Sequence, residues 1–385
     1  MVLHLLIFLS SLLVVSFSIP SIIYVAFRKR LFDAPNEDRK IHKKIIPNLG
    51  GVAIFTGFLF STSLFIKSSL LPEAGIVLAA GIILFVVGLK DDLVGMSPVK
   101  KLMAQVLAAL IIAVLADIRL KSMFGLFGVQ DIAYPVSIAI TVFTIVAIVN
   151  AFNLVDGIDG LAGGIGLVVS ITYALLFYLM GDIGWSFMAT ALGGSLVGFL
   201  IYNVSPAKIF MGDTGSLLVG LIASVLSIQL IELSSVHSAK AVDLGIQASP
   251  ALVLAVLIIP VFDTTRVFTL RILKKQSPFT ADRNHLHHRL IDLKLSHTSS
   301  ALILLGVNIT LIFFAISLQR IGTLPLILAI ASTVIIANIF LTLLLKYKTS
   351  KLPNSKRSTQ VKDKPVLKTE KEQFVDSILE KIAKN

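Results

Sequence analysis

Long apolar runs follow one another along most of the chain, separated by short segments rich in polar residues. Most of the runs hold about 18 or more residues, enough for a helix to cross the roughly 30 Å hydrocarbon core of a bilayer. The second and third runs are short and can be divided in another way. The pattern predicts an all-α, polytopic membrane protein with about eleven transmembrane helices, at residues 3–27, 49–66, 71–88, 99–116, 134–152, 160–180, 186–202, 214–232, 249–270, 300–318 and 322–345.

The distribution of positive charge predicts the orientation of these helices. The connections that alternate across the membrane differ sharply in basic residues, because one side holds all but five of the 34 lysines and arginines. Cytoplasmic loops collect basic residues, so we expect the N-terminus outside and the C-terminus in the cytoplasm. The net charge of +12 then reflects topology and attraction to anionic membrane lipids, and gives no indication of nucleic acid binding. The five residues on the outer side are Lys67, Arg119, Lys121, Lys240 and Arg320.

Composition agrees with a membrane protein. Hydrophobic residues make up 56% of the chain and charged residues 15%, against roughly 25% charged residues in soluble domains. Cysteine is absent, which excludes disulfides and a cysteine nucleophile. We expect a membrane-embedded domain at residues 1–346 and a basic cytoplasmic tail at residues 347–385. The tail is expected to be partly disordered, and its end, "EKEQFVDSILEKIAKN", can form a short amphipathic helix.

The polar segments with chemical potential all fall on the predicted cytoplasmic side. The stretch "NAFNLVDGIDGLAGG" (residues 150–164) places Asn153, Asp156 and Asp159 three residues apart, so that on a helix they share one face. Such oxygen-bearing side chains suit a hard cation such as Mg²⁺, or a polar ligand. A polar turn with a capping side chain is the simpler alternative.

Two further segments carry acidic residues. Asp91 and Asp92 are adjacent, and on a helix they point about 100° apart. One can therefore face a ligand while the other caps a helix or pairs with Lys90, Lys100 or Lys101. Asp213 lies between two glycines directly before an apolar run. There it either caps the helix or holds the metal of a phosphate bound at the helix N-terminus. Phe210, just before it, can stack on a planar base or simply anchor at the membrane interface.

The segment "DRNHLHHRL" is rich in histidine and arginine. Its histidines lack the spacing of a zinc site, so we interpret the cluster as a phosphate-binding group, with a solvated basic loop as the alternative. Upstream, Asp263 and Arg266 are three residues apart and are expected to form a structural ion pair, with a direct contact to substrate as the alternative. The basic and imidazole side chains of the segment are those of Arg283, His285, His287, His288 and Arg289.

Six motifs in this order resemble those of the polyprenyl-phosphate hexose-1-phosphate transferases of bacterial membranes: "RKIHKKIIPNLGG", "KDDL", "NAFNLVDGIDGLAGG", "FMGDTGSL", "FDTTRV" and "NHLHHRL". This family includes N-acetylglucosamine-1-phosphate transferases and the phospho-N-acetylmuramoyl-pentapeptide transferase. The resemblance implies a Mg²⁺-dependent reaction, with Mn²⁺ as an alternative ion. In it, the sugar-1-phosphate of a UDP-sugar passes to undecaprenyl phosphate at the cytoplasmic face of the bacterial inner membrane, and UMP is released.

The resemblance also implies a role for each candidate residue. Asn153 and Asp213 would hold the metal ion. Phe210 would stack on uracil and Asp159 would contact its edge. The implied catalytic residues are Asp91, Asp92, Asp156 and His287. The implied substrate-binding residues are Asp159, Phe210, Arg283, His285, His288 and Lys100.

Motif detail favours one substrate. The forms "NLVDGIDGLAGG" and "HLHHRL" resemble the N-acetylglucosamine branch more than the muramoyl-pentapeptide branch. We therefore expect UDP-N-acetylglucosamine as the donor and a product that starts a surface polymer such as O-antigen, a teichoic acid linkage or a capsule. UDP-MurNAc-pentapeptide or another UDP-N-acetylhexosamine is the alternative donor, and a homodimer is left open. Outside this class, the alternatives are an ion-coupled transporter, which predicts ionisable residues on both membrane sides, and a lipid-phosphate phosphatase.

Overall fold

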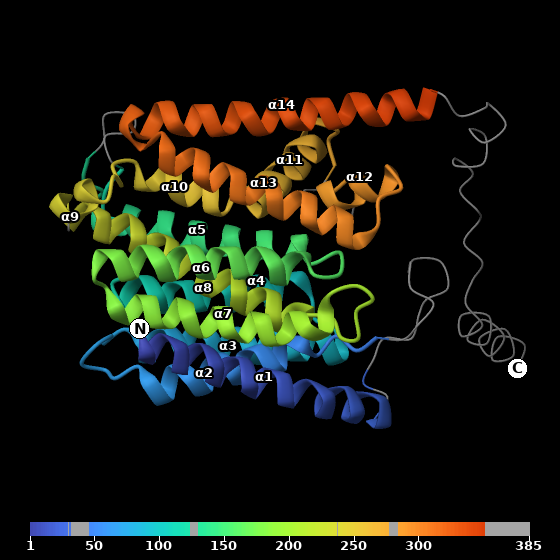
Figure 1. The fold of residues 1–385 in the computed structure, drawn as a ribbon, viewed down its shortest axis with the longest axis horizontal. Coiled ribbons are helices and arrows are strands. Elements are labelled where there is room, and N and C mark those ends of the chain that lie inside the picture. Colours follow the sequence, from blue (N-terminus) through green and yellow to red (C-terminus); the bar gives the residue numbers. More distant parts are fainter. Residues whose placement is uncertain (30, 32–45, 124–129, 237, 277–283, 351–385) are drawn as a thin grey trace, which may run out of the picture. The chain divides into compact units, whose positions relative to one another are not determined.

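The computed structural model describes residues 1–29, 31, 46–123, 130–236, 238–276 and 284–350. In these ranges the secondary structure is nearly all helical, and strand-like pairing is limited to one isolated bridge between Ser122 and Asp131. The chain divides into two units, Met1–Ala337 and Asn338–Asn385. In the first unit the long helices lie side by side (Figure 1).

The helices keep the order of the apolar runs in the sequence. The π-helical segment η1 (Ile111–Leu115) continues α4, and a 3₁₀ turn, η3 (Gln319–Ile321), follows α13. The α-helices are α1 (Val2–Lys29), α2 (Gly50–Phe65), α3 (Ala74–Val94), α4 (Pro98–Leu110), α5 (Tyr134–Val155), α6 (Leu161–Met180), α7 (Ile183–Asn203), α8 (Gly212–Val236), α9 (Ser238–Asp243), α10 (Ser249–Val256), α11 (Ile258–Leu273), α12 (Leu286–Asp292), α13 (His297–Ser317) and α14 (Thr323–Ser350).

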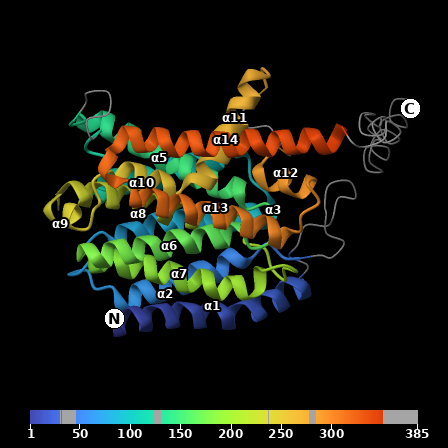
Figure 2. The same ribbon diagram turned by 45° about the horizontal axis from the view of Figure 1, so that its top comes forward.

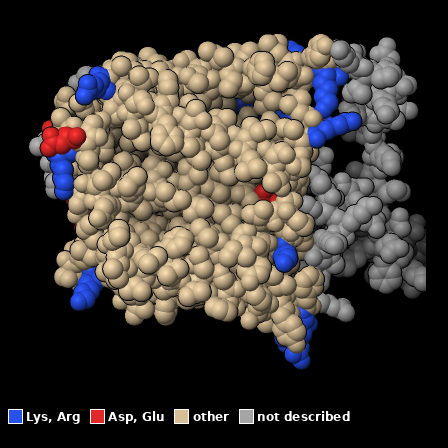
Figure 3. All heavy atoms as spheres, viewed as in Figure 1, with Lys and Arg blue, Asp and Glu red and all other residues tan. Residues whose placement is uncertain are grey.

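These helices are those of a multi-pass membrane protein. Within the described ranges, nine helices are long and apolar enough to cross a bilayer, and the bent pair α10 and α11 makes a tenth span if it is counted once. Helix α2 is apolar but has only 16 residues. In the view of Figure 3 the charged side chains gather toward two ends of the molecule, and the surface between them is formed by other residues. The exact number of eleven spans and the orientation of the termini stay predictions.

Helix α8 lies in the interior and is approached closely by its neighbours. A Cβ atom at Gly51 of α2 would overlap the backbone of Gly215 of α8, and one at Gly88 of α3 would overlap the backbone of Thr214. Small residues at these crossings let helix backbones pack directly on one another, which is how helices associate where water supplies no driving force. The N-terminal turn of α8 is therefore wedged between α2 and α3.

The run at residues 249–270, predicted as one span, is bent in the structure. The chain breaks at Leu257, and α11 leaves the direction of α10 at an angle of 78° (Figure 2). Pro260 explains the break, because its ring excludes a helical bond at this point and clashes with the carbonyl four residues earlier, that of Val256. The side-chain amide of Asn308 donates to the freed carbonyls of Ala255 and Val256, at 3.0 and 3.2 Å, so the break is satisfied inside the protein.

Candidate active site

The N-terminus of α8 is held by a side chain from another helix. This N-terminus lies at the same end of the bundle as α12 and the α5–α6 and α7–α8 connections (Figure 1). The Asp92 carboxylate, in the last turn of α3, accepts hydrogen bonds from the backbone N–H of Asp213 at 2.8 Å and of Thr214 at 2.9 Å. The Thr214 hydroxyl donates to the same carboxylate at 2.5 Å. Because a helix leaves its first N–H groups unpaired, Asp92 acts as a cap supplied from outside α8.

The segment before α8 pairs with the segment before α2. The N–H of Phe210 donates to the carbonyl of Pro47 at 2.9 Å. In return, Gly50 and Gly51 donate to the carbonyls of Phe210 and Met211, at 2.9 and 2.8 Å. Two motifs that are about 160 residues apart in the chain thus form one backbone unit, which fixes the half-buried Phe210 next to the start of α8.

The side chain of Asp213 contacts polar groups from two other helices, α5 and α4. The Asn153 amide, from α5, donates to Asp213 Oδ1 at 2.7 Å. The Lys101 ammonium, from α4, contacts Asp213 Oδ2 and lies 3.2 Å from Oδ2 of Asp91 in α3. One cation is therefore shared by two carboxylates. We call Asp91, Asp92, Lys101, Asn153 and Asp213 the carboxylate cluster.

Lys101 is one of the three lysines that the sequence offered as partners of Asp91 or Asp92, and its ion pair with Asp91 confirms that alternative. It was not among the expected substrate-binding residues. The prediction named its neighbour Lys100, which is exposed, whereas the Lys101 side chain is 15% exposed and reaches the carboxylate cluster. The phase of α4 could have distinguished them, because Lys101, Gln105 and Ala108 share one helix face. Gln105 and Ala108 are both buried, so this face points inward.

Asp156 directly follows α5 and lies close to the carboxylate cluster. Its half-buried carboxylate accepts a hydrogen bond from the N–H of Gly212. Burial, together with the nearby negative charge of Asp92, raises the pKa of Asp156 to about 7. Gly212 has a φ of +68°, and a Cβ atom there would overlap the carbonyl of Asn48 and the Asp92 carboxylate. Only glycine fits where these groups meet.

Asp159 lies deeper than its neighbour Asp156, with 5% of its surface exposed. Its carboxylate accepts from the N–H of Ala207 at 3.2 Å and lies 3.5 Å from Nδ1 of His297. Asn203 supports the same junction by accepting from the N–H of Gly160 at 2.9 Å. These contacts tie the α5–α6 connection to the α7–α8 connection and to α13. The predicted contact of Asp159 with a uracil edge stays a prediction.

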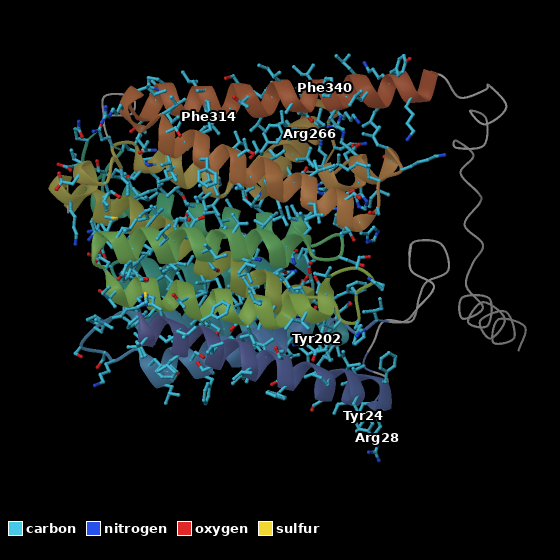
Figure 4. The ribbon with its side chains drawn as sticks, viewed as in Figure 1. Tyr24, Arg28, Tyr202, Arg266, Phe314 and Phe340 are labelled. Atoms are coloured by element: carbon cyan, nitrogen blue, oxygen red, sulfur yellow. The ribbon has the colours of Figure 1, made fainter. Side chains whose placement is uncertain are left out.

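The histidines are held by α11. The Asp263 carboxylate lies 2.9 Å from Nδ1 of His285 and accepts from the N–H of Leu286 at 2.8 Å, so it caps the start of α12. Arg266, labelled in Figure 4, donates to the carbonyl of Asn284 at 2.7 Å. Asp263 and Arg266 thus both bind the segment Asn284–Leu286. We call Asp263, His285, His287 and His288 the histidine cluster.

His287 brings the histidine cluster against the α5–α6 connection. It is 2% exposed, and its Nε2 has no hydrogen-bond partner among the described residues. A Cβ atom at Gly157 would overlap this ring, so Gly157 leaves the space that His287 fills. Burial and the nearby His288 ring, whose centroid is 4.3 Å away, lower the pKa of His287 to about 3, so the imidazole is neutral at ordinary pH. Arg283, predicted to bind substrate, lies outside the described residues.

Comparison with known proteins identifies the class. The family model for glycosyl transferase family 4 matches residues 74–231. The chain is 34% identical over 321 residues to the probable undecaprenyl-phosphate N-acetylglucosaminyl 1-phosphate transferase of Bacillus subtilis (strain 168), covering 81% of this chain and 84% of that protein. It is 32% identical over 288 residues to the decaprenyl-phosphate N-acetylglucosaminephosphotransferase of Mycobacterium leprae, covering 69% and 72%. It is 30% identical over 298 residues to the undecaprenyl-phosphate alpha-N-acetylglucosaminyl 1-phosphate transferase of Salmonella typhi, covering 74% and 78%.

The protein is therefore a sugar-phosphate transferase, built as a bundle of membrane helices with acidic and histidine clusters at one end. The chain belongs to glycosyl transferase family 4, and within it to the polyprenyl-phosphate N-acetylhexosamine-1-phosphate transferases that its motifs resemble. The family predicted from the sequence is confirmed, and so is an enzyme rather than a transporter.

Proposed function

We propose that this enzyme transfers N-acetylglucosamine-1-phosphate from UDP-N-acetylglucosamine to undecaprenyl phosphate, releasing UMP and starting a lipid-linked surface polysaccharide. One observation carries the proposal: the α5–α6 connection contacts both clusters. Asp156 lies next to the carboxylate cluster, and Gly157 packs against His287 of the histidine cluster. The printed names of the relatives support a polyprenyl phosphate as acceptor and N-acetylglucosamine as the sugar.

We place the active site at the cytoplasmic face of the bacterial inner membrane. Arg28 and Lys29 form the last turn of α1, and Arg28 lies at the same end of the bundle as α12 (Figure 4). Lys208 belongs to the α7–α8 connection at this end. Since cytoplasmic loops collect such residues, this distribution supports the proposed orientation. Anionic lipids at that surface would also attract them.

The carboxylate cluster fits a magnesium ion that arrives with a diphosphate. No three carboxylate, imidazole or thiol groups of the described residues converge as an all-protein metal site would need. Mg²⁺ bound with phosphates, however, uses only one or two protein carboxylates and keeps oxygen ligands throughout. Asp213 and Asn153 would hold it, and the contact of the Lys101 ammonium with Asp213 supports a cation at this point. The ion would draw charge from the diphosphate and from the leaving UMP.

The reaction requires two anions to approach each other. An oxygen of the acceptor phosphate bonds to the sugar-bearing phosphorus, and the bond from that phosphorus to the bridging oxygen breaks, so that UMP leaves with the electron pair. We favour this direct attack over a covalent aspartyl intermediate. Lys101 offsets the repulsion between the anions, because its ammonium already faces both Asp91 and Asp213. Asp91 lies beside that ammonium, where it can position or deprotonate the acceptor phosphate.

Two other groups suit proton and hydrogen-bond work at neutral pH. Asp156, with a pKa of about 7, can hold or release a proton at the operating pH. His287 is neutral, so its ring nitrogen Nε2 can form a hydrogen bond with the sugar phosphate but adds no positive charge there. Phe210 would stack on the uracil ring, and His285 and His288 would contact phosphate or sugar.

The test is an assay with purified enzyme in detergent, labelled UDP-N-acetylglucosamine, Mg²⁺ and undecaprenyl phosphate. A labelled lipid that appears together with UMP supports the proposal. Release of free phosphate from the lipid alone would favour a phosphatase instead. A panel of UDP-sugars, including UDP-MurNAc-pentapeptide, then ranks the donors, and a better donor than UDP-N-acetylglucosamine would overturn the sugar assignment.

The metal assignment is tested by a matched pair of variants. Asp213→Ala should abolish transfer and its dependence on Mg²⁺. Asp243→Ala, an exposed carboxylate on α9, should leave activity within about twofold, as surface substitutions usually do. Normal activity in Asp213→Ala would show that the metal is held elsewhere.

A further inference from the structure

Asp91 and Asp92 are adjacent in the sequence but have different partners. Asp91 Oδ2 faces the Lys101 ammonium at 3.2 Å, and its side chain is 20% exposed. Both oxygens of Asp92 are taken up at the start of α8: Oδ1 by the N–H of Asp213, and Oδ2 by the N–H and the hydroxyl of Thr214. A carboxylate already engaged by three donors has little capacity left for a metal ion or a substrate proton.

The backbone packs closely around Asp92 at two glycines. Gly88, one helical turn before Asp92 on α3, lies so close to Thr214 that a Cβ atom would overlap its backbone. Gly212 approaches the Asp92 carboxylate in the same way. The end of α3 and the first turn of α8 are thus pressed together at two glycines, with the Asp92 side chain between them. The helix dipole favours an anion at this place.

We propose that Asp92 is a positioning residue. It caps α8 from α3 and thereby orients the Asp213 carboxylate toward the metal ion. It does not accept the proton of the acceptor phosphate and it does not hold the metal. The physical reason is that Asp213 donates its own N–H to Asp92, so the cap fixes the backbone from which the Asp213 carboxylate projects. This inference rests on the proposed role of Asp213 as a metal ligand.

The two roles predict different results for a conservative substitution. Asparagine is as good an N-cap as aspartate, and Asp92→Asn keeps an acceptor oxygen for one of the two amides. We therefore expect Asp92→Asn to retain activity within about tenfold, and Asp92→Ala to lose more than about 100-fold. If Asp92 were a proton acceptor, Asp92→Asn would instead cost about 10²- to 10⁴-fold, like the removal of any general base.

The experiment measures both turnover and metal binding, with the full-length enzyme in detergent. Mn²⁺ binding without substrate, followed by electron paramagnetic resonance, should weaken in the order wild type, Asp92→Asn, Asp92→Ala. The pH profile of kcat/KM in Asp92→Asn should keep the shape of the wild type. Thr214→Val, which removes the hydroxyl donor, should weaken Mn²⁺ binding in the wild type and have no further effect in Asp92→Ala. Thr214→Ser, which keeps that donor, is the matched control.

Two outcomes would overturn the inference. The first is that Asp92→Asn is as inactive as Asp92→Ala while both bind Mn²⁺ like the wild type. The second is that Asp92→Ala is fully active. Should Asp92→Ala fail to fold, Asp92→Asn and the two Thr214 variants decide on their own. Asp213→Asn separates the failures: unchanged Mn²⁺ binding there means that the metal assignment is wrong, whereas weakened binding there but not in the Asp92 variants means that the positioning role is wrong.

Discussion

The starts of α8 and α12 use the same device at two places in the molecule. In each, an aspartate from a neighbouring helix accepts hydrogen bonds from the first amides: Asp92 at α8 and Asp263 at α12. Each cap also fixes a side chain of the candidate site, Asp213 in one case and His285 in the other. The two helices differ in what else holds them, because α8 has 25 residues and α12 only seven.

This difference decides what each cap contributes. Helix α8 is buried along most of its length and is pressed between α2 and α3, so its position does not depend on one side chain. A helix of two turns is not stable alone, so α12 depends on the groups that grip its start, namely Asp263 and Arg266. The cap of α8 therefore adjusts a single turn, whereas the cap of α12 holds a whole element in place.

The largest effect is expected on the α8 side, at Lys101. Lys101→Met leaves the carboxylates of Asp91 and Asp213 without their shared ammonium, and removing such a charge from an anion-transferring site costs about 10²- to 10³-fold in turnover. Lys90→Met, at an exposed position of α3, is the control and should stay within about twofold. Steady-state kinetics decide the question. Equal losses in the two variants would contradict the geometry of this cluster.

On the α12 side, Asp263→Ala tests whether the short helix depends on its cap. We expect a loss of about 100-fold in kcat/KM and faster hydrogen exchange throughout α12, because both His285 and the first amide lose their partner. Asp292→Ala, at an exposed position of the same helix, should change neither quantity. If exchange in α12 stayed slow in Asp263→Ala, the contrast with α8 would fail.

Gly157→Ala probes the contact between the histidine cluster and the α5–α6 connection. The added methyl group overlaps the His287 ring, which must move, and we expect kcat/KM to fall about tenfold. Gly306→Ala on α13, where a Cβ atom meets nothing, is the control for a glycine in this protein. Combining Gly157→Ala with His287→Ala should cost no more than His287→Ala alone. Additive losses would mean that Gly157 acts through another neighbour.

The smallest effect concerns the pH dependence of Asp156. Its pKa rises from about 4 to about 7 on folding, so between these pH values the folded protein keeps a proton that the unfolded chain has released. Stability therefore declines as pH rises through this window. Asp156→Asn should unfold at a higher temperature than the wild type above pH 7 and at the same temperature near pH 4, measured without divalent cations. A variant that is more stable only at low pH would reverse the sign.

The sequence predicted the helices well, but it did not predict which side chains contact one another. Apolar runs indicated each long helix, and motif chemistry pointed to Asp213, Asn153 and the histidines, all of which lie at one end of the bundle. Charge and spacing could not tell Asp91 from Asp92, because that difference arises where α3 meets α8, more than 100 residues later in the chain. The spacing of Asp263 and Arg266 likewise could not predict that both contact the segment Asn284–Leu286, about 20 residues later in the chain. Their expected ion pair stays a prediction.

The bend at Leu257 decides where the second half of this helix pair lies. An unbroken helix over residues 249–273 would run straight for about 37 Å, and its second half would follow the first. The bend of 78° instead turns α11 away from the direction of α10. Asp263 and Arg266 belong to α11, so the bend also determines their positions. Asn308, which is buried and donates to the carbonyls at the break, therefore stabilises the bend that places Asp263 beside His285.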